Sequence, residues 1–242
     1  MIAIYKREMR AFFTSPSGYL YISMFWALSS FLFCFFTLLA GKDSSITSYF
    51  TVELFVVGLM TPLLTMRSFA EERKLKTEQL LLTAPVSLPG MVLGKFLASY
   101  TIFGATFLCS CIGFPVAFSH LDGDMALWQY NSVRALGGCV ALLLVGAAFI
   151  AIGVLISSLT ENQFVAAAGT LTTLALLLLI SFLNSVIGFA PIRAVFNWLS
   201  IYARFANFSA GYFDFSALLY YASVCFVCLF LTVRVYEKRR WA

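Results

Sequence analysis

The positions of the charged residues constrain this chain more than any other feature. Between Tyr19 and Val233 the sequence contains six long apolar stretches, and its lysines and arginines are concentrated in alternate gaps between them. Hydrophobic residues make up 61% of the chain and charged residues only 11%. A water-soluble domain could not bury so much apolar surface. The sequence therefore predicts an all-α membrane protein whose main solvent is lipid.

The lengths of the apolar stretches predict the transmembrane spans. A helix needs about 20 apolar residues to cross roughly 30 Å of hydrocarbon. Six segments meet this need, and we expect spans at about 17–40, 47–66, 90–119, 132–157, 163–189 and 215–235. Residues 1–14 have apolar side chains at helical spacing, which predicts an interfacial elbow helix with its basic face toward anionic lipid. Residues 1–242 therefore form a single membrane domain.

The basic residues predict the orientation of the chain. Six spans place both termini on one side of the membrane. If that side is the cytoplasm, 12 of the 16 lysines and arginines lie inside and 4 lie outside, as the positive-inside rule favours. We expect a multi-pass protein of the bacterial cytoplasmic (inner) membrane with cytoplasmic termini. We expect no nucleic-acid partner, because no basic patch is interleaved with aromatic residues on a soluble surface.

The sequence has no motif for catalysis or for binding a nucleotide. The segment from Gly90 to Lys95 approaches a phosphate-binding loop, but the gap between its glycines is one residue short. Phe96 then follows the lysine, where a hydroxyl is needed for Mg²⁺. All six cysteines fall inside spans, where cysteine behaves as a small hydrophobe. We expect a non-enzymatic chain that holds no cofactor and no metal.

The longest inner segment, residues 67–89, carries the functional argument. It begins with dense mixed charge and becomes apolar at Leu80, Leu81 and Leu82. Pro85 then ends this pattern, and a new helix leads into the third span. We expect a short cytosolic helix held close to the membrane, whose leucines need the membrane surface or a partner protein to bury them. A solvated charged face is the ordinary alternative for such a run.

This segment resembles the loop signature of ABC-2 type transporter permeases. The similarity is carried by Glu71-Glu72-Arg73, by KTEQLLLTAPV at residues 76–86 and by LGKF at residues 93–96. Residues 157–163 and 237–241 also resemble the family. Within it, the chain is most similar to compact permeases associated with gliding motility and to related small exporters. The family usually has glycine where this chain has Lys76, which weakens the prediction of a sharp turn there.

The resemblance implies the permease subunit of an ATP-driven exporter. The implied partners are a cognate ABC ATPase that binds ATP and Mg, a second permease copy or a paralogue, membrane lipids and an extracytoplasmic accessory protein. The first cytosolic loop would be a coupling helix that contacts the ATPase through Glu71, Glu72, Arg73, Lys74, Thr77, Glu78, Gln79, Leu80 and Leu81. A second cytosolic contact is expected at Thr160, Glu161, Asn162 and Gln163.

Polar residues at membrane depth are candidates for a transport pathway, because they are costly there and tend to face protein or a cavity. The sequence offers Glu53 in the second span and Asn184 in the fifth. Residues 191–214 are too long for a turn and too aromatic for a disordered loop. They predict re-entrant outer helices before the last span, with an amphipathic loop lying on the lipid surface as an equal alternative.

A second function fits the same sequence. The chain could anchor or drive an extracytoplasmic partner without transporting anything, with the aromatic loop at Phe196–Phe213 as the contact surface. A secondary carrier is a weaker third alternative, because we find no internal repeat and no ion pair at the midplane.

Overall fold

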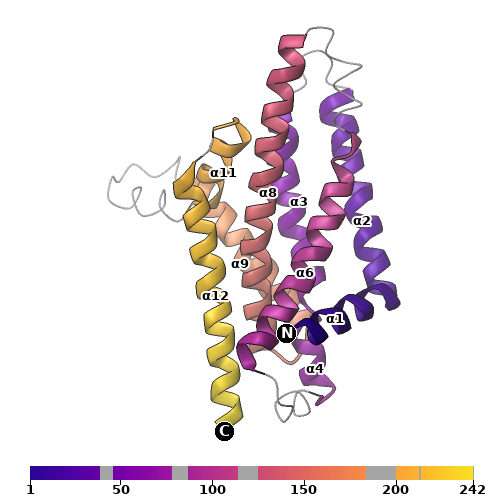
Figure 1. Cartoon of the computed structure of the whole chain (residues 1–242), viewed down its shortest axis with the longest axis vertical. Coiled ribbons are helices and arrows are strands. Elements are labelled where there is room, and N and C mark those ends of the chain that lie inside the picture. The colour runs from indigo at the N-terminus through magenta and orange to yellow at the C-terminus, as the bar shows by residue number, and fades with distance from the viewer. Residues whose placement is uncertain (39–45, 78–86, 114–124, 184–199, 213, 242) are drawn as a thin grey trace.

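The chain folds as a bundle of helices (Figure 1). The computed structural model describes residues 1–38, 46–77, 87–113, 125–183, 200–212 and 214–241. Six of the described helices are long and apolar enough to cross a membrane, which confirms the predicted all-α, six-span fold class. These are α2 (Pro16–Phe33), α3 (Ile46–Thr65), α6 (Leu88–Ser110), α8 (Met125–Leu159), α9 (Gln163–Leu183) and α12 (Phe215–Trp241). A short π-helix, Cys34–Leu38, continues α2.

Two short helices lie with both chain termini at one end of the bundle (Figure 1). The first, α1 (Ile2–Thr14), precedes the first span, in the place predicted for the elbow helix. Ser15 ends α1 in an extended conformation and Pro16 begins α2, so the chain bends between the two helices. The second, α4 (Ala70–Lys74), follows α3 after a short turn. The segment that was predicted to couple to a partner therefore begins at the end of the bundle that carries the termini.

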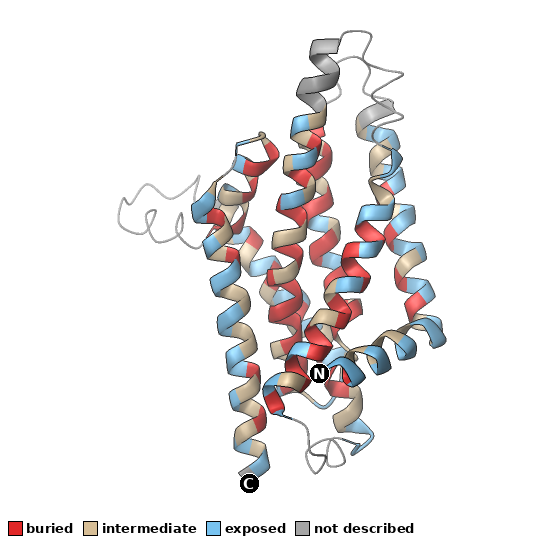
Figure 2. Ribbon diagram, viewed as in Figure 1, coloured by how far each residue is buried: buried red, intermediate tan, exposed pale blue. Residues whose placement is uncertain are grey.

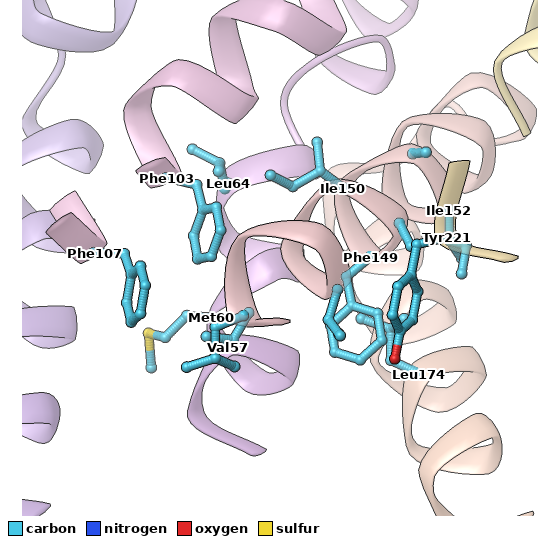
Figure 3. Close-up of a cluster of buried hydrophobic side chains, with 14 of the residues drawn as sticks. Val57, Met60, Leu64, Phe103, Phe107, Phe149, Ile150, Ile152, Leu174 and Tyr221 are labelled. Carbon is cyan, nitrogen blue, oxygen red and sulfur yellow. The ribbon is translucent and has the colours of Figure 1, made fainter. Parts of the chain in front are cut away.

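The core lies among α3, α6 and α8. Figure 3 shows its side chains, with Val57 and Met60 from α3 facing Phe103 from α6 and Phe149 from α8. In α2, α9 and α12 only 17%, 22% and 17% of the apolar spans are buried, and the remaining residues are intermediate or exposed (Figure 2). Lipid tails are as apolar as these side chains, so such faces need no protein cover in a membrane. The three inner helices are therefore the ones whose movement would rearrange the core.

Small residues bring the inner helices close together. A Cβ atom at Gly146 of α8 would overlap the ring of Phe103, and one at Gly153 would overlap the side chain of Thr65. Glycine at these positions lets α8 approach α6 and α3 more closely than any other residue would. The contact beside Gly153 lies just under two helical turns before the end of α8, near which α4 is attached.

Part of the aromatic segment before the last span is helical. Helix α11 (Ile201–Ser209) buries Ile201, Phe205 and Phe208. It is fastened by a hydrogen bond from Ser200 to Ser181 of α9 at 2.9 Å, and by one from the Tyr221 hydroxyl of α12 to the Ile201 carbonyl at 2.9 Å. The observed part of this segment thus packs on protein. Residues 184–199, including Asn184, lie outside the described residues.

Candidate functional site

Helix α4 lacks an N-terminal cap of its own and takes one from α8. Phe69, at the N-cap position, makes no side-chain capping bond. Instead, the Ser157 hydroxyl oxygen accepts hydrogen bonds from the backbone N–H groups of Phe69 at 3.1 Å and Ala70 at 3.2 Å. The first N–H groups of a helix have no partner within the helix, and these two hydrogen bonds satisfy two of them. It also fixes the start of α4 to the end of α8.

A sharp turn ends α4 despite the absence of glycine. Lys76 has a φ of 57°, in the left-handed region. Its N–H bonds the Arg73 carbonyl at 3.1 Å, and the N–H of Thr77 bonds the Glu72 carbonyl at 3.0 Å. This pair of bonds is the Schellman motif, in which glycine usually occupies the left-handed position. The sequence argument against a sharp turn at Lys76 was therefore wrong.

A buried ammonium group joins three helices at this end of the bundle. The side chain of Lys95, in α6, is only 1% exposed, and its Nζ lies 3.1 Å from Glu8 Oε1 of α1 and 3.0 Å from Glu72 Oε1 of α4. It also donates to the Ser68 carbonyl at 2.6 Å. Arg7 of α1 pairs with both of these carboxylates. We call Arg7, Glu8, Glu72 and Lys95 the junction network.

The junction network balances two cations with two carboxylates. Burial raises the pKa of Glu8, but Lys95 and Arg7 lower it further than burial raises it, so its pKa lies below the ordinary value. The carboxylate is therefore ionised at neutral pH. A buried pair contributes less to net stability than its contacts suggest, because both ions lose hydration, but removing one partner leaves a buried charge uncompensated. The network thus specifies how α1, α4 and α6 fit together.

The two cytosolic patches that were predicted from the sequence lie side by side. Arg73 of α4 pairs with Glu161 at 2.7 Å and donates to the Leu159 carbonyl at 3.1 Å. The Asn162 side chain accepts from the backbone N–H of Phe164 at 3.0 Å, and so caps α9. In the same turn, Thr160 bonds the Ile156 carbonyl at 3.4 Å and Gln163 begins α9.

The last helix reaches the same place. Arg239 of α12 donates to the Ser158 carbonyl at 2.7 Å, and the ring of Tyr236 lies 4.9 Å from that of Phe69. Helix α4 and the residues beside it are therefore bonded to or packed against α1, α6, α8 and α12.

The tip of α4 and the turn after it remain exposed. Lys74, Lys76 and Thr77 are exposed, and Leu75 between them is 64% exposed. Glu71 is partly buried and faces the interior side of the helix, where it lines a cavity. Glu78, Gln79, Leu80 and Leu81 lie outside the described residues. Of the predicted coupling residues, Glu72 and Arg73 are thus engaged within the chain, while Lys74 and Thr77 are accessible.

Three important residues were not among the sequence-predicted site residues. Lys95 had entered only as a basic residue and as part of two sequence motifs, Ser157 only as part of a family-like patch, and Glu8 had not been singled out. Lys95 did carry a signal, because a cation inside an apolar helix requires an anionic partner nearby. Nothing in the sequence showed that its partners would be Glu8 of α1 and Glu72 of α4.

Glu53, a predicted pathway residue, is fully buried in α3 at 0% exposure. Neither of its carboxylate oxygens has a hydrogen-bond partner among the described residues. One turn away, the Tyr49 hydroxyl is bonded to Ser29 of α2 at 2.9 Å. The pathway role of Glu53 and Asn184 stays a prediction.

Most of the residues described above lie within a match to one protein family. The family model described as ABC-2 family transporter protein matches residues 41–241. The match includes α4, the α8–α9 turn and Lys95, and it leaves out α1 with Arg7 and Glu8. Comparison with the curated proteins found no match.

Proposed function

We propose that this chain, which belongs to the ABC-2 family of transporter proteins, couples ATP hydrolysis by a separate ATPase subunit to export across the membrane. As a family member with six apolar helices it is a multi-pass membrane subunit of a transporter. The observation that carries the proposal is the attachment of α4, whose tip is exposed while its body is bonded to α1, α6 and α8. Such a helix can receive a displacement and pass it to the core.

The contacts of α4 suggest how a displacement spreads. A partner that moves Leu75 moves Glu72 on the same short helix, and Glu72 is held by Lys95 of α6 and Arg7 of α1. The cap at Ser157 and the bonds of Arg73 carry the same movement to α8 and the start of α9. Helices α6 and α8 are two of the three inner helices, so the push reaches the core without passing through a long loop.

The proposal includes an orientation and an assembly. The basic residues of both termini and of α4 lie at one end of the bundle (Figure 1), and the positive-inside rule favours that end as cytoplasmic. We therefore propose a bacterial inner-membrane protein with cytoplasmic termini, paired with a second permease copy or a paralogue. The partner ATPase would bind ATP and Mg. The direction, export, follows from the family resemblance alone.

The test is association with a cognate ABC ATPase, measured on the complex in lipid nanodiscs. Lys74→Glu and Leu75→Glu change exposed side chains that form no hydrogen bond or ion pair with another described residue, so the fold should persist. We expect both variants to lose ATPase association at an unchanged melting temperature. Lys6→Glu makes the same charge change on α1 and should leave association intact. Full association and full ATPase stimulation in both tip variants would refute the proposal.

A transport assay distinguishes export from the alternative role, in which the chain is an anchor or a force-transmitting subunit. If the intact complex couples ATP hydrolysis to α4 but moves no lipid, drug or glycan between vesicle compartments, the non-transporting role is favoured. Helix α11, which α9 and α12 hold firmly, is then the surface to vary.

A further inference from the structure

A cavity of about 400 Å³ lies between α1, the start of α2, the end of α3 and α6. Its lining changes along the bundle axis. The end nearest α4 is charged, whereas the deeper part is apolar and includes Leu63, Ala98 and Ile102. From Lys95 to Ile102 the wall of α6 rises by about 10 Å at 1.5 Å per residue. The cavity is thus polar at the end of the bundle and apolar toward its middle, the same order as one leaflet of a membrane.

The charged end has two groups left over after the internal pairs are formed. Three cations and three carboxylates line it: Arg7, Arg67, Lys95, Glu8, Glu71 and Glu72. The four members of the junction network bond to one another. Arg67 and Glu71 remain, and neither forms an ion pair with another described residue.

Arg67 is positioned to bind an anionic group. Its Nη1 donates to the Ser17 hydroxyl at 2.7 Å, and Ser17 shares a hydrogen bond with Ser15 at 2.8 Å. Its buried Nε has no hydrogen-bond partner among the described residues. A guanidinium with unused donors beside hydroxyl groups is suited to a phosphate, since its planar fork matches the phosphate oxygens.

We propose that this cavity binds a phospholipid whose headgroup carries both a phosphate and a primary ammonium. The phosphate would bind Arg67 with the hydroxyls of Ser15 and Ser17, and the ammonium would bind the Glu71 carboxylate. One acyl chain would lie against Leu63 and Ile102. The site is formed by five helices, α1, α2, α3, α4 and α6, and is not a single helix end.

The charge balance selects this ligand over a simple anion. Equal numbers of cationic and anionic side chains give the cavity no net charge to attract free phosphate. A zwitterionic headgroup gives Arg67 an anionic partner and Glu71 a cationic partner at the same time. The apolar depth of the cavity would stay unfilled by any ligand that lacks an acyl chain.

Occupancy would tie the elbow helix to the bundle through lipid as well as through the junction network. The ligand would touch α1 and α4 on one side and α6 on the other. Lipid binding in this cavity does not depend on an ATPase. The lipid proposal could therefore fail while the coupling proposal stands, and the coupling proposal could fail while the lipid proposal stands.

The test is lipid binding by the purified, delipidated full chain in detergent, measured by native mass spectrometry. The probes are phosphatidylethanolamine, phosphatidylglycerol, phosphatidylcholine and water-soluble phosphoethanolamine. We expect wild type to prefer phosphatidylethanolamine, and Arg67→Gln to weaken its binding about tenfold, as loss of a charged hydrogen bond would. Arg67→Lys should recover part of the binding, because it restores the charge without the fork.

Two further variants separate the parts of the site. Glu71→Gln should bind phosphatidylethanolamine and phosphatidylglycerol equally, since it loses the partner of the ammonium. Lys74→Gln, on the same helix but exposed, should behave as wild type. Equal binding of all three phospholipids by wild type would overturn the proposal, as would binding unchanged in Arg67→Gln. Full occupancy by phosphoethanolamine alone would show a soluble phosphate site and would also overturn it. If Arg67→Gln does not fold, Arg67→Lys and Glu71→Gln decide the question.

Discussion

Replacing Lys95 by methionine tests whether the junction network holds α1, α4 and α6 together. The substitution keeps most of the side chain's volume and removes its charge and three polar contacts: two carboxylates and the Ser68 carbonyl. Glu8 and Glu72 would then share a single counter-ion, Arg7. The side chain of Arg7 is 48% exposed and is thus a weaker partner than the buried ammonium.

The expected cost follows from burial. Removing one partner of a buried ion pair usually costs about 3–5 kcal/mol. The side chains of Glu8 and Glu72 are 24% and 17% exposed, so water can relieve part of the penalty. We expect a loss near the lower end, about 3 kcal/mol. For a chain of this size that corresponds to a fall in melting temperature of roughly 6–12 °C.

Thermal unfolding of the purified chain in one fixed detergent measures this effect. The control is Glu237→Gln, which breaks the Arg234–Glu237 pair, 2.7 Å apart with side chains 62% and 38% exposed. An exposed pair of this kind should contribute less than about 1 kcal/mol. Combining Lys95→Met with Glu8→Gln and Glu72→Gln removes the uncompensated charges and should restore most of the stability. If Lys95→Met costs no more than Glu237→Gln, our reasoning about the network is wrong.

Three further predictions concern single features. Lys76→Gly should raise stability by about 1 kcal/mol in chemical unfolding, because glycine adopts a left-handed φ without penalty; a loss of stability would mean that the lysine side chain itself holds the turn. The Sγ atoms of Cys111 and Cys139 lie 3.6 Å apart, so these two residues should form a disulfide under a mild thiol oxidant. Mass spectrometry should detect the linked peptide in wild type and not in Cys111→Ser. Absence of the link in wild type would contradict the packing of α6 on α8. The stability that Glu8 contributes should be full at pH 7, since the folded state favours the ionised form. It should begin to fall as the pH passes the ordinary pKa of 4.5 and be lost as the pH falls through the lower pKa of the folded state. The melting temperatures of wild type and Glu8→Gln should converge over that range, and a constant difference would argue against the assigned charge state.

The fold could be predicted from the sequence because lipid imposes a simple rule. Every span needs a long apolar run and satisfied backbone bonds, so the helices are visible in composition alone. The short helix after the second span was also predictable, because a dense run of charges begins where the apolar run of α3 ends. These are local properties, and they require no knowledge of which helices are neighbours.

The contacts of α4 could not be predicted in the same way. Lys95 bonds Glu8 across 87 positions of sequence, and several other carboxylates are nearer along the chain. Ser157 caps a helix that lies 87 positions before it. Which partner wins depends on how α1 and α8 meet α4 in space. Lys76 shows the opposite error, in which a rule about glycine was applied where backbone hydrogen bonds hold a lysine in the same conformation.

The side of the membrane that α4 faces tests the central claim most directly. A Leu75→Cys variant on a background without the six native cysteines places one thiol on the exposed tip. It can be labelled with a membrane-impermeant maleimide in vesicles of known orientation. We predict labelling when the cytoplasmic face is outward and protection when it is inward. Labelling from the opposite face would put α4 beyond the reach of any cytoplasmic ATPase and would contradict the proposed coupling.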